Sequence, residues 1–229
     1  VNENIAKELF IKLDQKMRYW TSSLINKEKI NPEDVWDALA ENTVRPSYNH
    51  DLCPCNPFFT SRESFIDEIE EELRNGKERV IFLKGLPGIG KTNIISKLSN
   101  KRDSLLRIRY YAYEPVQPDK EYLPVDVSER VRKEVFWNEM FSQLRNVLKG
   151  KLKKYNVPLQ NDFMTLGDMK KRFFEIASRY AADEETIFIV AIDGIDHAAR
   201  AGEGVETFLK TLPNPAYIPE NVKLLIAGQ

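Results

Sequence analysis

A glycine-rich octapeptide in the first half of the chain contains the residue types that bind phosphate. Residues 85–92 read Gly-Leu-Pro-Gly-Ile-Gly-Lys-Thr, the complete P-loop pattern. The glycines allow backbone N–H groups to turn inward around phosphate oxygens, and a helix that begins there adds a favourable dipole for anions. In this pattern Lys91 reaches the β- and γ-phosphates, and the Thr92 hydroxyl coordinates Mg²⁺. A glycine-rich turn that fits by chance is the alternative, and the Lys-Thr pair after an apolar run disfavours it. The residues expected to contact nucleotide are Gly85, Pro87, Gly88, Ile89, Gly90, Lys91, Thr92 and Asn93.

A second acid is needed on the magnesium side of a P-loop, at the end of a neighbouring strand. Residues 187–192 are six apolar residues in a row, and Asp193 follows them directly. This is the Walker B arrangement, so Asp193 is expected to bind Mg²⁺ with Thr92. The alternative is a buried strand that ends in a solvated aspartate.

Two further polar residues follow Asp193 closely. A turn after the strand would place Asp196 near the γ-phosphate, where a carboxylate can orient the attacking water. The expected catalytic residues are therefore Lys91, Asp193 and Asp196. His197 is expected either to sense phosphate or to cap the turn.

The elements that position these residues follow from hydrophobic periodicity. Strands are predicted over residues 80–83, 105–113, 186–192 and 222–227. Helices are predicted over residues 61–75, 92–98, 128–149, 166–181 and 205–212. Alternating strands and helices predict an α/β fold with a parallel sheet of the P-loop NTPase type and flanking helices. A helical segment precedes it, so we expect residues 1–50 to form a helical segment or linker and residues 51–229 an NTPase domain.

The P-loop and the segment of residues 187–198 together resemble STAND-class NTPases, especially their NACHT-like branch, which is related to AAA+ proteins. In that group the Walker B strand runs into Asp-Gly, an apolar residue and then acids, and Asp193, Gly194, Ile195 and Asp196 match this order. His197 stands where an acid is usual, which implies slow or regulated hydrolysis. Residues 57–63 resemble the segment that lies against adenine and ribose in the family, which implies that role for Phe59 and Arg62. Packing of Phe59 in the core is the alternative.

The resemblance implies a regulatory switch that binds ATP with Mg²⁺, or ADP at rest, and forms a homo-oligomer on activation. Effector and sensor domains would lie outside this segment, and antiviral defence is the role that the resemblance implies. Residues 223–229 resemble the strand that carries sensor 1, but the chain reaches Gln229 without the usual arginine. Because no further strand or winged helix follows, we expect the domain to be incomplete at its C-terminus.

Composition and charge narrow the classes of protein to which this chain could belong. The formal net charge is −1, from 34 basic and 35 acidic residues, so nucleic acid held by bulk charge is not indicated, although a local patch is compatible. The basic residues at 170–172 are interpreted as a solvated face. No apolar run is long enough for a membrane span, and two cysteines make no disulfide framework, so a cytoplasmic protein is expected. His50, Cys53 and Cys55 lie close in sequence but lack a fourth zinc ligand, so an ordinary connector is preferred.

Two other functions remain open at this stage. A nucleic-acid-handling AAA+ ATPase of initiator or loader type shares the segment before the P-loop, and a basic winged helix would distinguish it. A small-molecule phosphotransferase would need an acceptor pocket and a lid, for which the sequence gives no sign.

Overall fold

The computed structural model of this chain describes residues 62–100, 106–112, 130–158, 165–201 and 206–229, together with Asp14. The predicted helical segment or linker over residues 1–50, apart from Asp14, lies outside these residues, as do Phe59 and the group His50, Cys53 and Cys55.

Four parallel strands form a single sheet in the described residues. In chain order they are β1 (Val80–Lys84), β2 (Leu106–Tyr111), β3 (Phe188–Asp193) and β4 (Val222–Gly228). Their order in the sheet is β1-β4-β3-β2, and every pairing is parallel. The predicted α/β class with a parallel sheet is therefore confirmed. The two central strands are buried at every position, as expected for strands covered on both faces.

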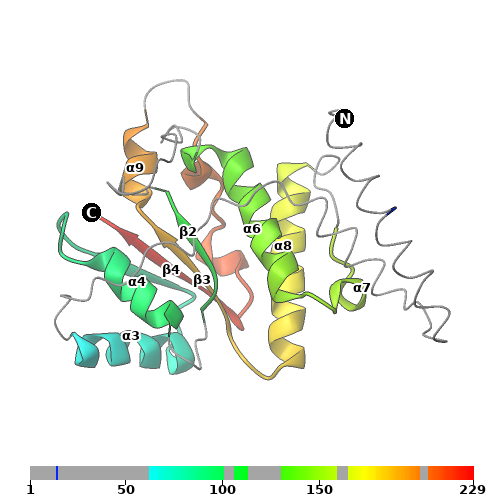
Figure 1. Cartoon of the computed structure of the whole chain (residues 1–229), viewed down its shortest axis with the longest axis horizontal. Coiled ribbons are helices and arrows are strands. Elements are labelled where there is room, and N and C mark those ends of the chain that lie inside the picture. Colours follow the sequence, from blue (N-terminus) through cyan, green and yellow to red (C-terminus); the bar gives the residue numbers. More distant parts are fainter. Residues whose placement is uncertain (1–13, 15–61, 101–105, 113–129, 159–164, 202–205) are drawn as a thin grey trace.

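Helices cover the sheet on both faces, so the described part of the chain has three layers (Figure 1). The first layer contains α3 (Glu63–Asn75) and α4 (Lys91–Asn100). The other layer contains α6 (Lys133–Val147) and α8 (Leu166–Asp183). Side chains alternate along β4, and this alternation assigns each residue to one layer. Leu225 and Ala227 pack toward α3 and α4, and Val222, Leu224 and Ile226 pack toward α6 and α8.

Aromatic rings fill the core under α6 and α8. Phe136 stacks on Phe208 with ring centroids 4.5 Å apart, and Trp137 meets Phe173 edge to face at 5.9 Å. The indole N–H of Trp137 donates to the Thr211 hydroxyl at 2.9 Å, which satisfies its only polar atom. This cluster fixes α6 and α8 over the strand that ends in the predicted acid.

Two polar contacts tie the layers to the sheet. Lys223 of β4 is 2% exposed, and its ammonium donates to the carbonyls of Glu72 (2.9 Å) and Gly76 (2.6 Å). A cation there satisfies carbonyls at the C-terminus of α3 and favours the helix dipole. At the β2 edge of the sheet, the side-chain amide of Gln143 pairs with the backbone of Arg109: it accepts from the N–H at 3.0 Å and donates to the C=O at 2.7 Å.

The predicted helix over residues 205–212 is wrong in type. The described part of that segment is a 3₁₀ turn, η2 (Phe208–Thr211), and Pro213 cannot extend a helical hydrogen-bond ladder beyond it. Three short elements were not predicted: α7 (Leu152–Tyr155), α9 (Ile195–Arg200) and η3 (Pro215–Tyr217). Among the residues that the structure describes, no helix has the length and apolar character needed to cross a bilayer.

Candidate functional site

The glycine-rich loop connects the end of β1 to the start of α4. Gly88 and Gly90 have φ of 75° and 95°, the left-handed region that glycine enters without steric cost. The loop is anchored on both sides, because the Gly85 N–H donates to the Gly228 carbonyl (3.2 Å) and the Ile94 N–H to the Gly90 carbonyl (3.0 Å). Its backbone is thus held open between a strand and a helix N-terminus, the arrangement that favours an anion.

Lys91 begins α4 and folds back over the loop. Its ammonium donates to the carbonyl of Gly85 at 2.7 Å and to that of Leu86 at 3.0 Å. Both acceptors belong to the loop itself, so the cation is held directly beside the space that the loop surrounds. A phosphate oxygen that entered this space could replace the carbonyls as the acceptor, because ammonium bonds to anionic oxygen are stronger.

Thr92 and Asp193, which lie 101 positions apart, meet across α4 and β3. The Thr92 hydroxyl donates to the Asp193 carboxylate with an O···O distance of 2.5 Å. The alternation along β3 explains the contact, since Ile189 and Ala191 face the α4 layer and Asp193 is two residues further on. The structure therefore brings together the two residues that the sequence predicts as magnesium ligands.

Burial and neighbouring hydrogen-bond donors shift the pKa of the Asp193 carboxyl in opposite directions. The residue is only 6% exposed, and desolvation raises the pKa of its carboxyl above the ordinary aspartate value. The Thr92 hydroxyl, the backbone N–H of Gly194 and the charge of Lys91 oppose that rise in pKa, whereas Asp196 adds to it. A cation bound beside this carboxylate would favour its ionised form, as expected for a metal-binding acid.

Asp196 lies on α9, the short helix that begins just after β3. Gly194 turns the chain there with φ of 78°, and its N–H donates to the Ala227 carbonyl at 3.1 Å. The Asp196 carboxylate is 13% exposed and lies 3.7 Å from the Arg200 guanidinium and 3.8 Å from the His197 imidazole. The Asp196 carboxylate lies close enough to Asp193 to raise the pKa of Asp193, but its nearest cation is Arg200 of the same helix.

Arg200 is a site residue that the sequence interpretation missed. Its guanidinium also donates to the side-chain carbonyl of Gln229 at 2.6 Å, directly after β4. One cation thus joins Asp196 to the residue that stands where a sensor arginine was expected. The four-residue spacing of Asp196 and Arg200 on a helix was the available signal.

The remaining predicted contacts lie at the margin of this site. Asn93 is half-buried in the first turn of α4. Arg62 is the N-cap residue of α3, and its carbonyl accepts from the Ile66 N–H at 2.9 Å. The helix that Arg62 precedes packs on α4 through Ile66 and its apolar neighbours, so Arg62 belongs to the same layer as the loop. No group of three or more His, Cys, Asp or Glu in the described ranges has the arrangement of a metal site.

No protein-family model matches this chain, and no match is found among curated proteins or solved structures. The fold therefore stands as an α/β domain with a four-stranded parallel sheet, without an assigned family.

The donor set fits a nucleotide with a divalent cation. A carboxylate and a hydroxyl converge at Asp193 and Thr92, and such oxygen ligands are the ones that Mg²⁺ prefers, with waters and phosphate oxygens completing its shell. Lys91 is the only cationic residue of the octapeptide 85–92, and at Gly88 and Gly90 no side chain covers the loop backbone. These residues could hold a triphosphate and its metal ion at one edge of the sheet.

Proposed function

We propose that this chain is the ATP-binding switch domain of a signal-transducing NTPase of the STAND class. The observation that carries the proposal is the contact between Thr92 and Asp193, which places a P-loop hydroxyl and a strand-end carboxylate 2.5 Å apart. A chance glycine turn would not require an acid from a distant strand at that point. The resemblance of residues 85–92 and 187–198 to that class supports the finer assignment.

The reaction would be hydrolysis of ATP, in which water attacks the γ-phosphorus, the bond to the β-phosphate oxygen breaks, and ADP and phosphate leave. Lys91 would exchange its carbonyl partners for β- and γ-phosphate oxygens, while the loop N–H groups hold the phosphate chain. Bound Mg²⁺ would offset phosphate charge between Thr92 and Asp193. Asp196 would orient the attacking water, and Arg200 would position its carboxylate.

The switch would operate through the elements that meet at this edge. The P-loop is bonded to Gly228 of β4, α9 is bonded through Gly194 to the same strand, and Arg200 bonds to Gln229. Loss of the γ-phosphate would therefore change the positions of α9 and of the end of β4, because both are hydrogen-bonded to elements of the phosphate site. Ordering of loops by a phosphate and their relaxation after hydrolysis is a general device of nucleotide switches. In this proposal the ATP state forms a homo-oligomer and activates an effector.

Nucleotide binding is tested with Lys91→Ala. The substitution removes the ammonium that would donate to the β- and γ-phosphate oxygens, so magnesium-ATP affinity should fall by about 10- to 100-fold, as for loss of roughly 1.4–2.8 kcal/mol. Isothermal titration calorimetry gives the affinity directly. The matched control is Lys153→Ala, because Lys153 is exposed on α7 and lies outside the site. Equal affinity in wild type and Lys91→Ala would remove the phosphate-site assignment.

The switch is tested with a pair of acids. Asp193→Ala should weaken ATP-dependent assembly by loss of metal support, whereas Asp196→Ala should keep ATP binding and slow turnover. In a switch, the slower variant stays longer in its ATP state and assembles at least as well as wild type. Turnover and assembly are measured for both variants. If Asp196→Ala stops turnover and also abolishes assembly while ATP still binds, a turnover-driven loader explains the protein better.

A further inference from the structure

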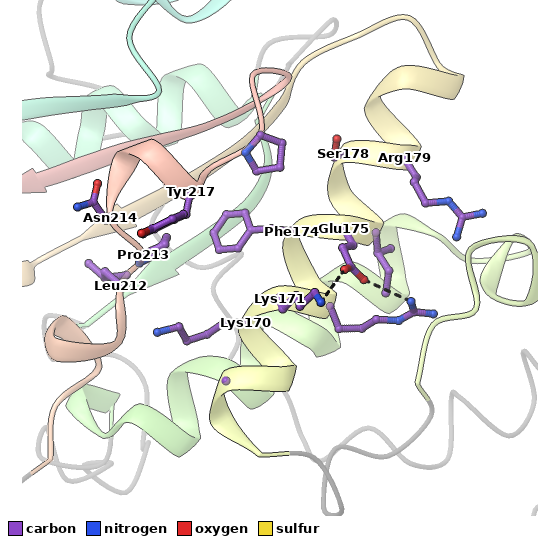
Figure 2. A pocket seen from close by; sticks show the side chains of 14 residues that line it. Lys170, Lys171, Phe174, Glu175, Ser178, Arg179, Leu212, Pro213, Asn214 and Tyr217 are labelled. Atoms are coloured by element: carbon purple, nitrogen blue, oxygen red, sulfur yellow. Dashed lines mark ion pairs between the residues drawn. The ribbon is translucent and has the colours of Figure 1, made fainter.

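A groove on the α8 side of the molecule has a chemistry that the nucleotide site does not use. It has a volume of about 790 Å³ and lies between α8 and the segment of residues 212–219. Figure 2 shows Phe174 and Lys170 extending from α8 toward the segment that carries Tyr217, while the Lys171 ammonium is turned toward Glu175. The Tyr217 side chain is 82% exposed although it is large and aromatic.

The groove is strongly basic for a chain of net charge −1. Its lining contains four cationic residues and one carboxylate, which gives a local charge of +3. The single acid, Glu175, is shared, since it lies 3.9 Å from Lys171 and 3.5 Å from Arg172. The groove therefore combines an apolar floor with an excess of positive charge, a combination that suits an acidic helix with an aromatic anchor. The cationic residues are Lys170, Lys171, Arg172 and Arg179.

The chain itself carries such a helix on its opposite layer. Six of the thirteen residues of α3 are acidic and one is basic, so the helix has a charge of −5. Its inward face is formed by Ile66, Ile69 and Leu73, which leaves the acids outward. Phe65 is 40% exposed on the outer side, and Glu68 follows it by one helical turn.

Figure 1 shows that α3 and α8 run in different directions, so a neighbouring copy must be rotated as well as displaced to lay its α3 along the groove. Because the surfaces lie on opposite layers, they cannot meet within one chain.

We propose that the basic groove between α8 and residues 212–219 binds the acidic helix α3 of a second copy of this chain. Phe65 of one copy packs on the apolar floor at Phe174 and Tyr217, and the carboxylates of Glu68 and Glu71 face Lys170 and Lys171. Such a contact is heterologous, since each copy offers a different surface to each neighbour, and it propagates into a ring or a filament. This contact would supply the interface of the homo-oligomer in the proposed function. The dependence of the contact on ATP rests on that proposed function.

The test uses full-length chain with and without magnesium-ATP, with mass measured by light scattering after gel filtration. Wild type should assemble, and higher salt should weaken the assembly because the contact is charged. The groove variant Lys170→Glu/Lys171→Glu and the helix variant Glu68→Lys/Glu71→Lys should each shift the midpoint concentration upward by at least about tenfold. Lys153→Glu is the matched control, an exposed reversal on α7 outside the groove, and should assemble as wild type does.

Rescue decides whether the two surfaces meet each other. A chain that carries both pairs of reversals should assemble again, and a mixture of the groove variant with the helix variant should form a dimer, since one intact surface of each remains. Circular dichroism confirms that every variant is folded. No assembly of wild type up to roughly 0.5 mM in either condition, where the binding free energy would be weaker than about −4.5 kcal/mol, would overturn the contact.

Failure of this contact is distinguishable from failure of the proposed function. ATP affinity is measured by calorimetry on each variant and should be unchanged, because no substituted residue belongs to the phosphate site. Binding of ATP without assembly would overturn the contact together with the assembly step of the proposed function, and would leave the ATP site standing. Assembly that persists in both variants would also overturn it, and retention of single-stranded nucleic acid by wild type but not by the groove variant would then assign the groove to that ligand.

Discussion

The contact between Thr92 and Asp193 makes a prediction about stability that needs no nucleotide. Thr92→Val keeps the shape of the side chain but removes the hydroxyl that donates to a carboxylate only 6% exposed. The carboxylate then keeps the Gly194 N–H but loses its side-chain donor. A hydrogen bond to a charged group contributes about 1.5–3 kcal/mol, so the free energy of unfolding should fall by about that amount.

The pH dependence has a definite sign. Burial raises the pKa of Asp193, so the folded chain holds a proton that the unfolded chain has already released just above the ordinary aspartate range. The free energy of unfolding therefore falls as pH rises through that interval. Thr92→Val removes an interaction that lowers this pKa and makes the fall larger. At low pH, where the carboxyl is neutral in both states, the cost of Thr92→Val should shrink to about 0.5–1.5 kcal/mol.

Urea denaturation of nucleotide-free protein at neutral and acidic pH measures these costs. In thermal unfolding, the neutral-pH cost corresponds to a lower Tm by about 3–12 °C for a domain of this size. Thr92→Ser is the control, because it keeps the hydroxyl. The interaction itself is isolated by repeating Thr92→Val in an Asp193→Asn background, where the cost should be smaller. Equal costs in the two backgrounds at every pH would refute the assignment of the effect to this hydrogen bond.

Two further predictions concern the loop and the resting state. Gly88→Ala and Gly150→Ala both place a side chain at positive φ in open space, so each should lower the free energy of unfolding by about 1–2 kcal/mol. Only Gly88→Ala should weaken ATP binding in calorimetry, because Gly150 lies outside the P-loop. If the proposed function is right, His197 replaces a catalytic acid, so basal hydrolysis should be slow and purified protein should carry nucleotide, which chromatography after denaturation would detect. Fast basal turnover would contradict this expectation.

The sheet could be predicted because its central strands are unusual in composition. Residues 186–192 and 222–227 are nearly continuous apolar runs, the pattern of strands buried on both faces, and the structure has β3 and β4 there. The spacing of the P-loop and of Asp193 likewise predicted the meeting of Thr92 with the strand-end acid. Both signals are local, and both occur where burial or backbone geometry restricts the choice of residue.

What could not be predicted depends on contacts between distant segments. Lys223 interrupts an apolar run and would ordinarily be placed in solvent, yet the C-terminal carbonyls of α3 accept its ammonium. Arg200 follows Asp196 by four residues, but a six-residue helix is too short for the sequence to show that this spacing is helical, and its contact with Gln229 depends on the end of β4. The segment at 205–212 was predicted as helix from its apolar spacing, but Phe208 and Thr211 pack against α6 in a tighter turn.

The side-chain amide of Gln143 covers part of the β2 edge of the sheet. By pairing with both backbone groups of Arg109, it acts as a one-residue substitute for a neighbouring strand along β2. An extended peptide that approached this border would have to displace an amide already bonded to Glu139 at 2.8 Å. Growth of the sheet into a continuous ribbon from chain to chain is thereby obstructed at β2. Contacts between two copies of this chain at the β2 border would therefore have to use side chains and not the exchange of strands, which is slow to undo.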